Sequence, residues 1–264
     1  MPTPPSLATP PSGAETSLAH AMNLQDQVCV ITGAARGIGL ALAKSLIARG
    51  ALPVLVDLDA SALAAAEASL PEDRTLAITA DVTRADDLAR VVAQARARLG
   101  EIAVWINNAG LARHRWIADY SEAEIDLMLD VNLKGTILGS QAALRAMMPQ
   151  RHGHIVNIIS TASLRGIPSE TVYCAAKWGV RGFTQGLAEE AAPHRIRVTA
   201  LLPGGVDTAF WDEASERAAP RQLFLRPEQV ADGVLRCLEM DDTCVPRELV
   251  LRSLDDADFS VQPA

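Results

Sequence analysis

The sequence predicts an α/β protein: one domain built on a doubly wound parallel sheet with helices on both faces. From Gln27 onward, short apolar runs alternate with longer amphipathic stretches. The short runs are aliphatic and β-branched with little polar alternation, which is typical of parallel strands covered on both faces. A glycine-rich turn follows the first of these runs. Because parallel strands that alternate with helices are joined by right-handed crossovers, this order indicates a parallel sheet.

Seven apolar runs are interpreted as strands. In chain order they are Val28–Thr32, Pro53–Asp57, Leu76–Ala80, Val104–Asn107, Ile155–Ile159, Val198–Leu202 and, as a candidate last strand, Glu248–Leu251. The amphipathic stretches between them predict helices near residues 38–49, 60–69, 84–99, 121–148, 171–192 and 227–239. We find no internal repeat and no sign of a second domain, so residues 23–264 are expected to form a single folded unit.

The first 22 residues differ in composition from the rest of the chain. They are rich in Pro, Ser, Thr and Ala, with prolines at positions 2, 4, 5, 10 and 11. Such a stretch cannot propagate a helix and has little apolar surface to bury. It also lacks the basic start and the continuous apolar centre of a secretory signal. Residues 1–22 are therefore expected to be a flexible extension outside the fold.

The bulk composition excludes several classes of function. The chain has 264 residues, of which 49% are hydrophobic and 21% charged, and its net charge is −8. That charge argues against a general affinity for nucleic acid or anionic membranes, and no apolar run is long enough to span a bilayer. The four cysteines form no Cys-x-x-Cys pair and lack histidines at metal-ligand spacing. We expect mostly buried thiols in a reducing compartment, no metal site, and a cytoplasmic protein.

The glycine-rich turn is the first candidate for binding chemistry. It reads Thr-Gly-Ala-Ala-Arg-Gly-Ile-Gly from residue 32 and runs straight into the first expected helix. Gly33 permits the tight turn, Gly37 lets the backbone approach a pyrophosphate, and Gly39 allows close helix–strand packing. The helix N-terminus then meets the phosphate charge. This position, rather than the glycines alone, predicts a dinucleotide site that includes Arg36 and Ile38.

An acidic residue at the end of the second expected strand bears on the choice of cofactor. Asp57 lies where a carboxylate can accept hydrogen bonds from the adenosine ribose and repel a 2′-phosphate. Leu58 follows Asp57, so the next position offers no positive charge to bind the 2′-phosphate of NADP. Arg36 in the glycine turn is the one feature that favours the phosphorylated cofactor. We weigh Asp57 more heavily and expect NAD, with NADP as the open alternative.

Tyr173 and Lys177 form the second candidate for chemistry. Residues four apart on a helix lie on one face, so the phenol and the ammonium should lie within reach of each other. An ammonium beside a phenol favours the phenolate, and we therefore expect the pKa of Tyr173 to be lowered toward the working pH. The pair alone is weak evidence for a catalytic site, because this spacing is common by chance. The evidence becomes stronger because the glycine turn and Asp57 occur in the same chain.

With these features in order, the chain from about Asn23 to its end resembles the classical short-chain dehydrogenase/reductase family, which has a Rossmann-type fold. Further matching motifs occur in the expected order. They are the adenine-contacting pair Asp81 and Val82; the turn Asn107, Asn108, Ala109 and Gly110; the helix residue Asn132; the serine Ser160; and the segment Pro203, Gly204, Gly205, Val206, Asp207 and Thr208. Ile159 stands where many members have another serine, and Thr161 and Ser163 lie in the same loop. The spacing to Tyr173 favours Ser160 for the serine's role, with Ser163 as the second candidate. Cys174 replaces the more usual Ser or Ala.

The resemblance implies hydride transfer between a nicotinamide dinucleotide and a carbonyl or secondary alcohol. By this resemblance Tyr173 would move the proton, and Lys177 would hold the nicotinamide ribose and keep that proton labile. Ser160 would hydrogen-bond the substrate oxygen, and Asn132 would support a water chain to Lys177. Asn132 also has a purely structural interpretation, since it can satisfy backbone groups within its helix. A catalytically silent dinucleotide sensor with a protein partner is the second, less favoured function.

The substrate is expected to be a small and partly apolar molecule. The segment from Val206 to about Arg226 corresponds to the family's substrate lid. Apolar candidates for the cleft are Phe210, Trp211, Leu223, Phe224, Leu111, Trp116 and Leu164, although they are equally suited to packing the lid or a subunit interface. Arg113, His114 and Arg115 could attract an acidic group, but a solvated basic turn is the favoured interpretation. His152 and His154 are interpreted as surface turn residues. The resemblance further implies a homotetramer or homodimer.

Overall fold

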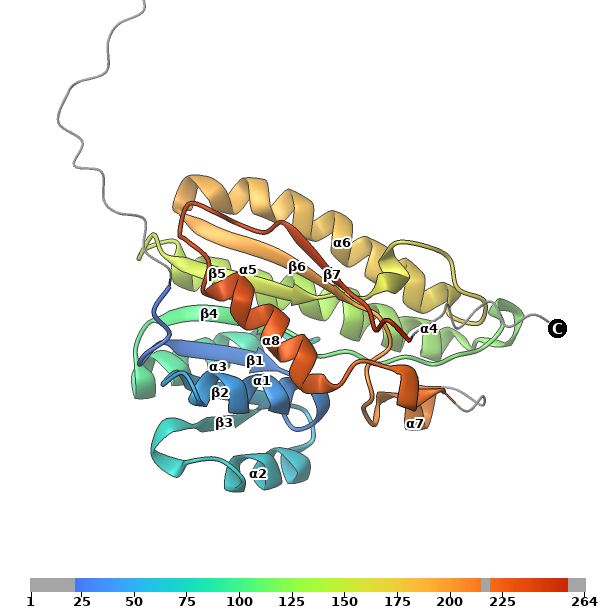
Figure 1. The fold of residues 1–264 in the computed structure, drawn as a ribbon, viewed down its shortest axis with the longest axis horizontal. Helices are drawn as coiled ribbons and strands as arrows, with labels where there is room; N and C mark the ends of the chain where they lie inside the picture. Colours follow the sequence, from blue (N-terminus) through green and yellow to red (C-terminus); the bar gives the residue numbers. More distant parts are fainter. Residues whose placement is uncertain (1–21, 215–218, 256–264) are drawn as a thin grey trace, which may run out of the picture.

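The computed structural model describes residues 22–214 and 219–255, which form a seven-stranded sheet with helices on both faces (Figure 1). All six strand pairings are parallel, and the strand order is β3-β2-β1-β4-β5-β6-β7. The chain therefore winds outward from β1 in one direction and then, from β4, in the other. This topology confirms the predicted doubly wound α/β fold.

The element boundaries follow the predicted pattern closely. The strands are β1 (Val28–Thr32), β2 (Leu52–Asp57), β3 (Leu76–Thr79), β4 (Ile102–Asn107), β5 (Gly153–Ile158), β6 (Ile196–Pro203) and β7 (Glu248–Leu251). The helices are α1 (Gly37–Ile47), α2 (Ala60–Ala68), α3 (Ala85–Leu99), α4 (Glu122–Leu129), α5 (Gly135–Met147), α6 (Thr171–Ala191), α7 (Phe210–Ala214) and α8 (Pro227–Leu238). The candidate last strand is confirmed as β7.

The strands carry apolar residues without alternation because both faces of the sheet are covered. In β1, Cys29 and Ile31 join a core with α1, α2 and α8, whereas Val28 and Val30 join a second core with α3, α5 and α6. Successive side chains of a strand point to opposite faces, so each strand serves both layers. The two helix layers on either side of the sheet can be followed in Figure 1.

The expected helix over 121–148 is interrupted. It consists of α4, a π-helical turn (η3, Asp130–Lys134) and α5. Ser121 caps α4 through a capping box with Glu124, which satisfies backbone donors at the start of the helix. Thr136 Oγ1 donates to the carbonyl oxygen of Asn132 at 2.8 Å, inside the irregular segment. Short π segments occur frequently at functional sites, and this one contains a predicted site residue.

Two expectations, one for the start of the folded part and one for β5, are revised by burial. Met22 is packed into the core, so the folded part already includes this residue; the rest of the expected extension, residues 1–21, lies outside the described residues. His154 is fully buried in β5, and its Nε2 lies 2.8 Å from Thr199 Oγ1. The surface interpretation of His154 was wrong because the residue lies inside a central strand. His152 is exposed, as expected.

The burial of the cysteines agrees with the expectation of mostly buried thiols. Cys29, Cys174 and Cys237 are buried free thiols, and Cys244 is exposed. Within the described ranges, no helix combines the length and the apolar character needed to cross a membrane.

Candidate active site

One large cavity lies at the carboxyl ends of the central strands. Its volume is about 450 Å³. Ligands of doubly wound sheets bind at this edge, at the point where the strand order reverses, which here lies between β1 and β4. Among the predicted cofactor residues, the cavity is lined by Gly33, Arg36, Gly37, Ile38, Asp57, Leu58, Asp81, Val82, Asn108, Ala109, Gly110, Pro203, Gly204, Val206 and Thr208. The fold therefore brings these residues, from five segments of the chain, to one cavity.

The glycines of the β1–α1 turn are required by space and by backbone conformation. Gly33 and Gly37 have φ of 65° and 54°, the left-handed region in which side chains are strained. A Cβ on Gly33 would lie 2.8 Å from Ala109 Cα, and one on Gly39 would lie 2.2 Å from Gly33 O. Gly39 does not line the cavity itself; it lets α1 start directly beneath the turn. The result is a backbone cradle at a helix N-terminus, suited to a pyrophosphate.

The turn after β4 is bonded to the glycine turn. Asn108 Nδ2 donates to the carbonyl oxygens of Thr32 and Gly33, at 3.0 and 2.9 Å. The hydroxyl of Thr32 in return accepts from the backbone nitrogens of Asn108 and Ala109, at 3.0 and 3.1 Å. These four hydrogen bonds fix the two turns relative to each other and so define one wall of the cavity.

Asp57 and Arg36 face the same end of the cavity, and both side chains are engaged. Asp57 Oδ2 accepts from Ala35 N at 3.0 Å, and Oδ1 accepts from Asp59 N at 3.1 Å. Arg36 Nη2 lies 3.2 Å from Asp59 Oδ2 and forms an exposed ion pair. The Asp57 carboxylate is thus oriented by backbone donors, while the Arg36 charge is shared with a neighbouring acid.

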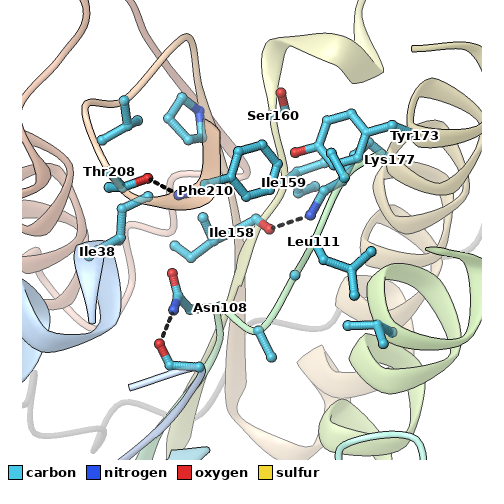
Figure 2. A pocket seen from close by; sticks show the side chains of 18 of the residues that line it. Ile38, Asn108, Leu111, Ile158, Ile159, Ser160, Tyr173, Lys177, Thr208 and Phe210 are labelled. Carbon is cyan, nitrogen blue, oxygen red and sulfur yellow. Dashed lines mark hydrogen bonds between the residues drawn. The ribbon is translucent and has the colours of Figure 1, made fainter. Parts of the chain in front are cut away.

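Ser160, Tyr173 and Lys177 meet at the other end of the cavity (Figure 2). Ser160 follows β5, and the other two residues lie one turn apart in α6. Lys177 Nζ donates to the carbonyl oxygen of Ile158 at 3.4 Å and lies 5.5 Å from the centroid of the Tyr173 ring. The Ser160 hydroxyl accepts from Ala162 N at 3.1 Å and lines the same cavity as Tyr173. The predicted arrangement of phenol, amine and hydroxyl is therefore present at one place.

The expected lowering of the tyrosine pKa is not found. Burial raises the pKa of Tyr173, and the negative charge of Glu170 raises it further, whereas the nearby Ser160 hydroxyl lowers it. Burial also lowers the pKa of Lys177 to about 8. The expectation considered the ammonium alone, but desolvation disfavours both the phenolate and the ammonium and dominates in this enclosed site.

Asn132 is fully buried, and both its side-chain nitrogen and its side-chain oxygen bond to backbone partners. Its Nδ2 donates to the carbonyl oxygens of Leu111 and Met128, at 2.8 and 2.9 Å, and its Oδ1 accepts from Leu111 N at 3.3 Å. A Cβ on Gly110 would lie 2.9 Å from Asn132 Oδ1 and 3.6 Å from Lys177 Nζ. Gly110 thus lets these two side chains approach the same point, and the structural interpretation of Asn132 holds.

A row of aromatic rings closes the cavity beside Tyr173. The ring centroid of Phe210 lies 5.9 Å from that of Tyr173, Trp211 lies 5.6 Å from Phe210, and Phe224 lies 5.0 Å from Trp211. All three lid residues line the cavity, as does Leu111. Trp116, Leu164 and Leu223 were also expected there, but the described cavity lining does not include them; Trp116 and Leu164 are exposed.

Two polar residues at this end were missed. Glu170 lines the cavity at the start of α6, and His114 lies behind it with its Nε2 3.7 Å from Glu170 Oε1. Both side chains are at least nine-tenths buried, so the solvated interpretation of residues 113–115 was wrong for His114. The sequence contains little indication of this site. Glu170 lies three residues before Tyr173, but its burial in the site depends on the packing of the segment around residue 114 against it.

Comparison with known proteins agrees with this geometry. The family described as short chain dehydrogenase matches residues 27–219. The chain belongs to this family. An uncharacterized oxidoreductase of Staphylococcus aureus strain USA300 is 36% identical over 229 residues, which is 87% of this chain and 98% of the relative. A second, from Staphylococcus saprophyticus, is 32% identical over 234 residues, covering 88% and 99%.

Solved structures of the short-chain dehydrogenase family have the same fold. An alcohol dehydrogenase from the archaeon Thermococcus sibiricus, complexed with 5-hydroxy-NADP, has a TM-score of 0.79 at 28% identity and covers 90% of this chain and 99% of its own. A metagenomic short-chain oxidoreductase in complex with NADP has a TM-score of 0.76 at 30% identity, covering 88% and 99%. Levodione reductase has a TM-score of 0.79 at 29% identity, covering 89% and 100%. This short-chain dehydrogenase is thus an oxidoreductase of a family with dinucleotide-bound members.

Proposed function

We propose that this short-chain dehydrogenase transfers a hydride between a nicotinamide dinucleotide and a carbonyl or secondary alcohol carbon. The observation that carries the proposal is the convergence of Ser160, Tyr173 and Lys177 at one end of a cavity. The glycine cradle and Asp57 lie at the other end of the same cavity. The cradle fits a pyrophosphate because its glycines leave no room for a Cβ and present a helix N-terminus. The bound dinucleotide would supply the hydride chemistry, and the protein supplies position and electrostatics.

In this proposal Tyr173 gives a proton to the substrate oxygen during reduction and accepts it during oxidation. Burial keeps the phenol protonated, which suits a proton donor. Ser160 hydrogen-bonds the same substrate oxygen where negative charge develops, as in a small oxyanion site. Lys177 holds the cofactor ribose, and its charge stabilises the tyrosinate that remains after proton transfer. Its backbone partner, the carbonyl oxygen of Ile158, orients the amine toward the cavity.

Asn132 acts in this proposal by position. Its three hydrogen bonds to Leu111 and Met128 hold the π-helical turn against the segment that follows Gly110. This contact holds the cavity wall at Gly110 in place beside Lys177. The side chains of Asn132 and Lys177 both lie close to Gly110, so the position of this wall depends on them. The role in a water chain that the family resemblance implies remains a proposal for this chain.

We propose NAD as the preferred cofactor. The Asp57 carboxylate is held at the cavity by two backbone donors, where it would meet a 2′-phosphate with like charge. The nearby cation, Arg36, is already paired with Asp59. Two of the similar solved structures carry NADP or a derivative of it, which makes NADP the alternative to test.

The proposed substrate is partly apolar, because the aromatic row of Phe210, Trp211 and Phe224 borders the cavity next to Tyr173.

We also propose assembly into a homodimer or homotetramer. Trp178 on α6 and Leu127 on α4 are 48% and 42% exposed, and large exposed apolar groups on neighbouring helices suit a subunit contact. Light scattering after gel filtration would show a monomer if this assembly does not form.

The function is tested by a screen in two steps. Quenching of tryptophan fluorescence by NADH and by NADPH measures cofactor affinity, and we expect NADH to bind more tightly. Consumption of the preferred cofactor is then followed over ketones, keto acids, sugars, steroids and acyl thioesters. Turnover of a ketone supports the dehydrogenase proposal. Tight cofactor binding without turnover of any substrate would favour the dinucleotide-sensor function instead.

A further inference from the structure

The substrate end of the cavity contains a buried acid that the proposed reaction does not use. Glu170 precedes α6 as its N-cap residue, three positions before Tyr173, and its carboxyl side chain is only 8% exposed. It lines the cavity together with Ser160 and Tyr173. A buried carboxyl group is costly unless it makes compensating interactions, so its presence beside the reacting groups calls for a partner.

The group behind Glu170 does not provide that partner within the protein. His114 Nε2 lies 3.7 Å from Glu170 Oε1, which is too long for a hydrogen bond. Within the described part of the chain, this buried nitrogen has no hydrogen-bond partner. The His114 ring packs edge-on against Trp211, one of the aromatic residues that border the cavity. Two adjacent buried polar groups thus meet at the cavity wall without bonding to each other.

The charge state of the pair suits a neutral ligand. Burial raises the pKa of Glu170 to about 7, and Arg165, which also lines the cavity, opposes this rise. Burial lowers the pKa of His114 to about 4. Between these values both groups are neutral, and their contact is not an ion pair. The other titratable side chains that sense Glu170 are Tyr120, Tyr173 and Cys174, all uncharged in this range. A neutral carboxyl group offers both a hydrogen-bond donor and an acceptor.

We propose that Glu170, supported by His114, is a second polar anchor in the substrate site, which hydrogen-bonds a hydroxyl or carbonyl group other than the one that reacts. This inference rests on the proposed function and narrows its substrate class. The substrate would be a bifunctional, largely apolar molecule, such as a hydroxyketone, a diketone or a diol. Ser160 and Tyr173 receive the reacting oxygen, Glu170 receives the second oxygen, and Phe210 and Trp211 cover the carbon skeleton between them.

Binding can be measured without turnover, because the chain has only two tyrosines. Full-length protein labelled with ¹³Cζ-tyrosine gives two signals, and the variant Tyr120→Phe assigns them. The Tyr173 signal is followed at pH 6 while cyclohexanol, cyclohexane-1,3-diol or cyclohexane-1,4-diol is added, with and without NAD. We expect at least one diol to bind about fivefold to tenfold more tightly than cyclohexanol, as one further buried hydrogen bond predicts.

Three variants decide where this preference comes from. Glu170→Leu should reduce the diol preference to nearly onefold, whereas Glu170→Gln, which keeps a donor and an acceptor, should retain most of it. Glu228→Leu, at an exposed position in α8, is the matched control and should keep the full preference. Equal affinity for diols and cyclohexanol in the natural protein, no response of Tyr173 to either, or an unchanged preference in Glu170→Leu would each overturn the proposal.

The same ligands separate this inference from the proposed function. The corresponding ketones, cyclohexanone and the 3- and 4-hydroxycyclohexanones, are offered with NADH and NADPH. Turnover without any preference for the hydroxyketones would leave the dehydrogenase proposal standing and reject the second anchor. A diol preference in the binding measurement, combined with no turnover of any ketone, would support the anchor and reject the dehydrogenase.

Discussion

Lys177 Nζ lies 5.5 Å from the centroid of the Tyr173 ring, yet the pKa of the phenol is raised rather than lowered. The amine is itself buried and holds the carbonyl oxygen of Ile158. Burial therefore disfavours the charged form of both groups, and the site stores a protonated phenol beside an amine that titrates close to neutral pH. This pairing favours proton donation, the step needed in carbonyl reduction.

Tyr173→Phe should reduce ketone turnover by about 10³-fold, because general acid catalysis contributes roughly 10²–10⁴-fold. Cofactor affinity should change less than about threefold, since the ring itself remains. Tyr120→Phe is the control: this second tyrosine donates to the carbonyl oxygen of Arg113 but does not line the described cavity. Steady-state kinetics and fluorescence quenching measure the two quantities. Similar losses of turnover in both variants would remove Tyr173 from its proposed role.

The rate of reduction should fall as pH rises through about 8. Lys177, with a pKa lowered to about 8, loses its positive charge there and no longer stabilises the tyrosinate. Lys177→Arg keeps its charge at all these pH values, so whatever activity it retains should not show this decline. The logarithm of kcat/KM is measured from pH 6 to 10. If kcat/KM of the arginine variant declines with the same midpoint pH, the decline belongs to a group other than Lys177.

Asp57→Ser should shift the ratio of NADPH to NADH affinity toward NADPH by about tenfold to a hundredfold, because the repelling carboxylate is lost. Asp59→Asn is the comparison. It releases Arg36 from its ion pair while an asparagine can still cap α2. We expect a smaller shift in the same direction. Fluorescence titration with both cofactors measures the ratio, and a natural protein that already prefers NADPH would contradict the role given to Asp57.

Glu170→Gln should stabilise the protein at alkaline but not at acidic pH. Because the folded-state pKa of Glu170, about 7, exceeds its ordinary value of 4.5, folding is penalised as pH rises between these values. The penalty is complete above pH 7 and amounts to about 3 kcal/mol. His114 acts in the opposite sense, since its lowered pKa makes stability rise with pH between about 4 and 6.5.

The comparison of Glu170→Gln with the natural protein removes the contribution of His114, which both share. Urea denaturation should show a much larger difference in unfolding free energy at pH 8 than at pH 5, where only a small part of the penalty has developed. An equal difference at both pH values would mean that the Glu170 carboxyl is not buried in its charged form.

Gly110→Ala should destabilise the site by about 1–3 kcal/mol, because the added Cβ would lie 2.9 Å from Asn132 Oδ1 and force this hydrogen-bonded side chain to move. Gly182→Ala is a matched control in α6. Nothing lies within 4 Å of its added Cβ, and the higher helix propensity of alanine should stabilise the fold by about 0.5–1 kcal/mol. Thermal denaturation gives both values. A neutral Gly110→Ala would show that the contact is loose.

The helices and strands were predictable because the periodicity of apolar residues and the turn residues between them indicate these elements from the local sequence alone. Val28–Thr32 and Glu248–Leu251 were placed at their observed bounds. The glycine turn and the four-residue spacing of Tyr173 and Lys177 likewise need only neighbouring positions to be recognised. In contrast, the break between α4 and α5 was missed. Its π-helical turn contains Asn132, whose side chain bonds to the backbone of Leu111, a residue 21 positions away that the local pattern does not include.

The order of apolar runs and turns determined this protein's sheet, its helix layers and the position of its glycine cradle, since these follow from local conformation and the burial of strands on both faces. Only the tertiary structure decided the ionisation of Tyr173, Lys177, Glu170 and His114. Their pKa values depend on how completely residues distant in the chain exclude water from them. Desolvation is a property of the packed surroundings, and no spacing within the sequence expresses it.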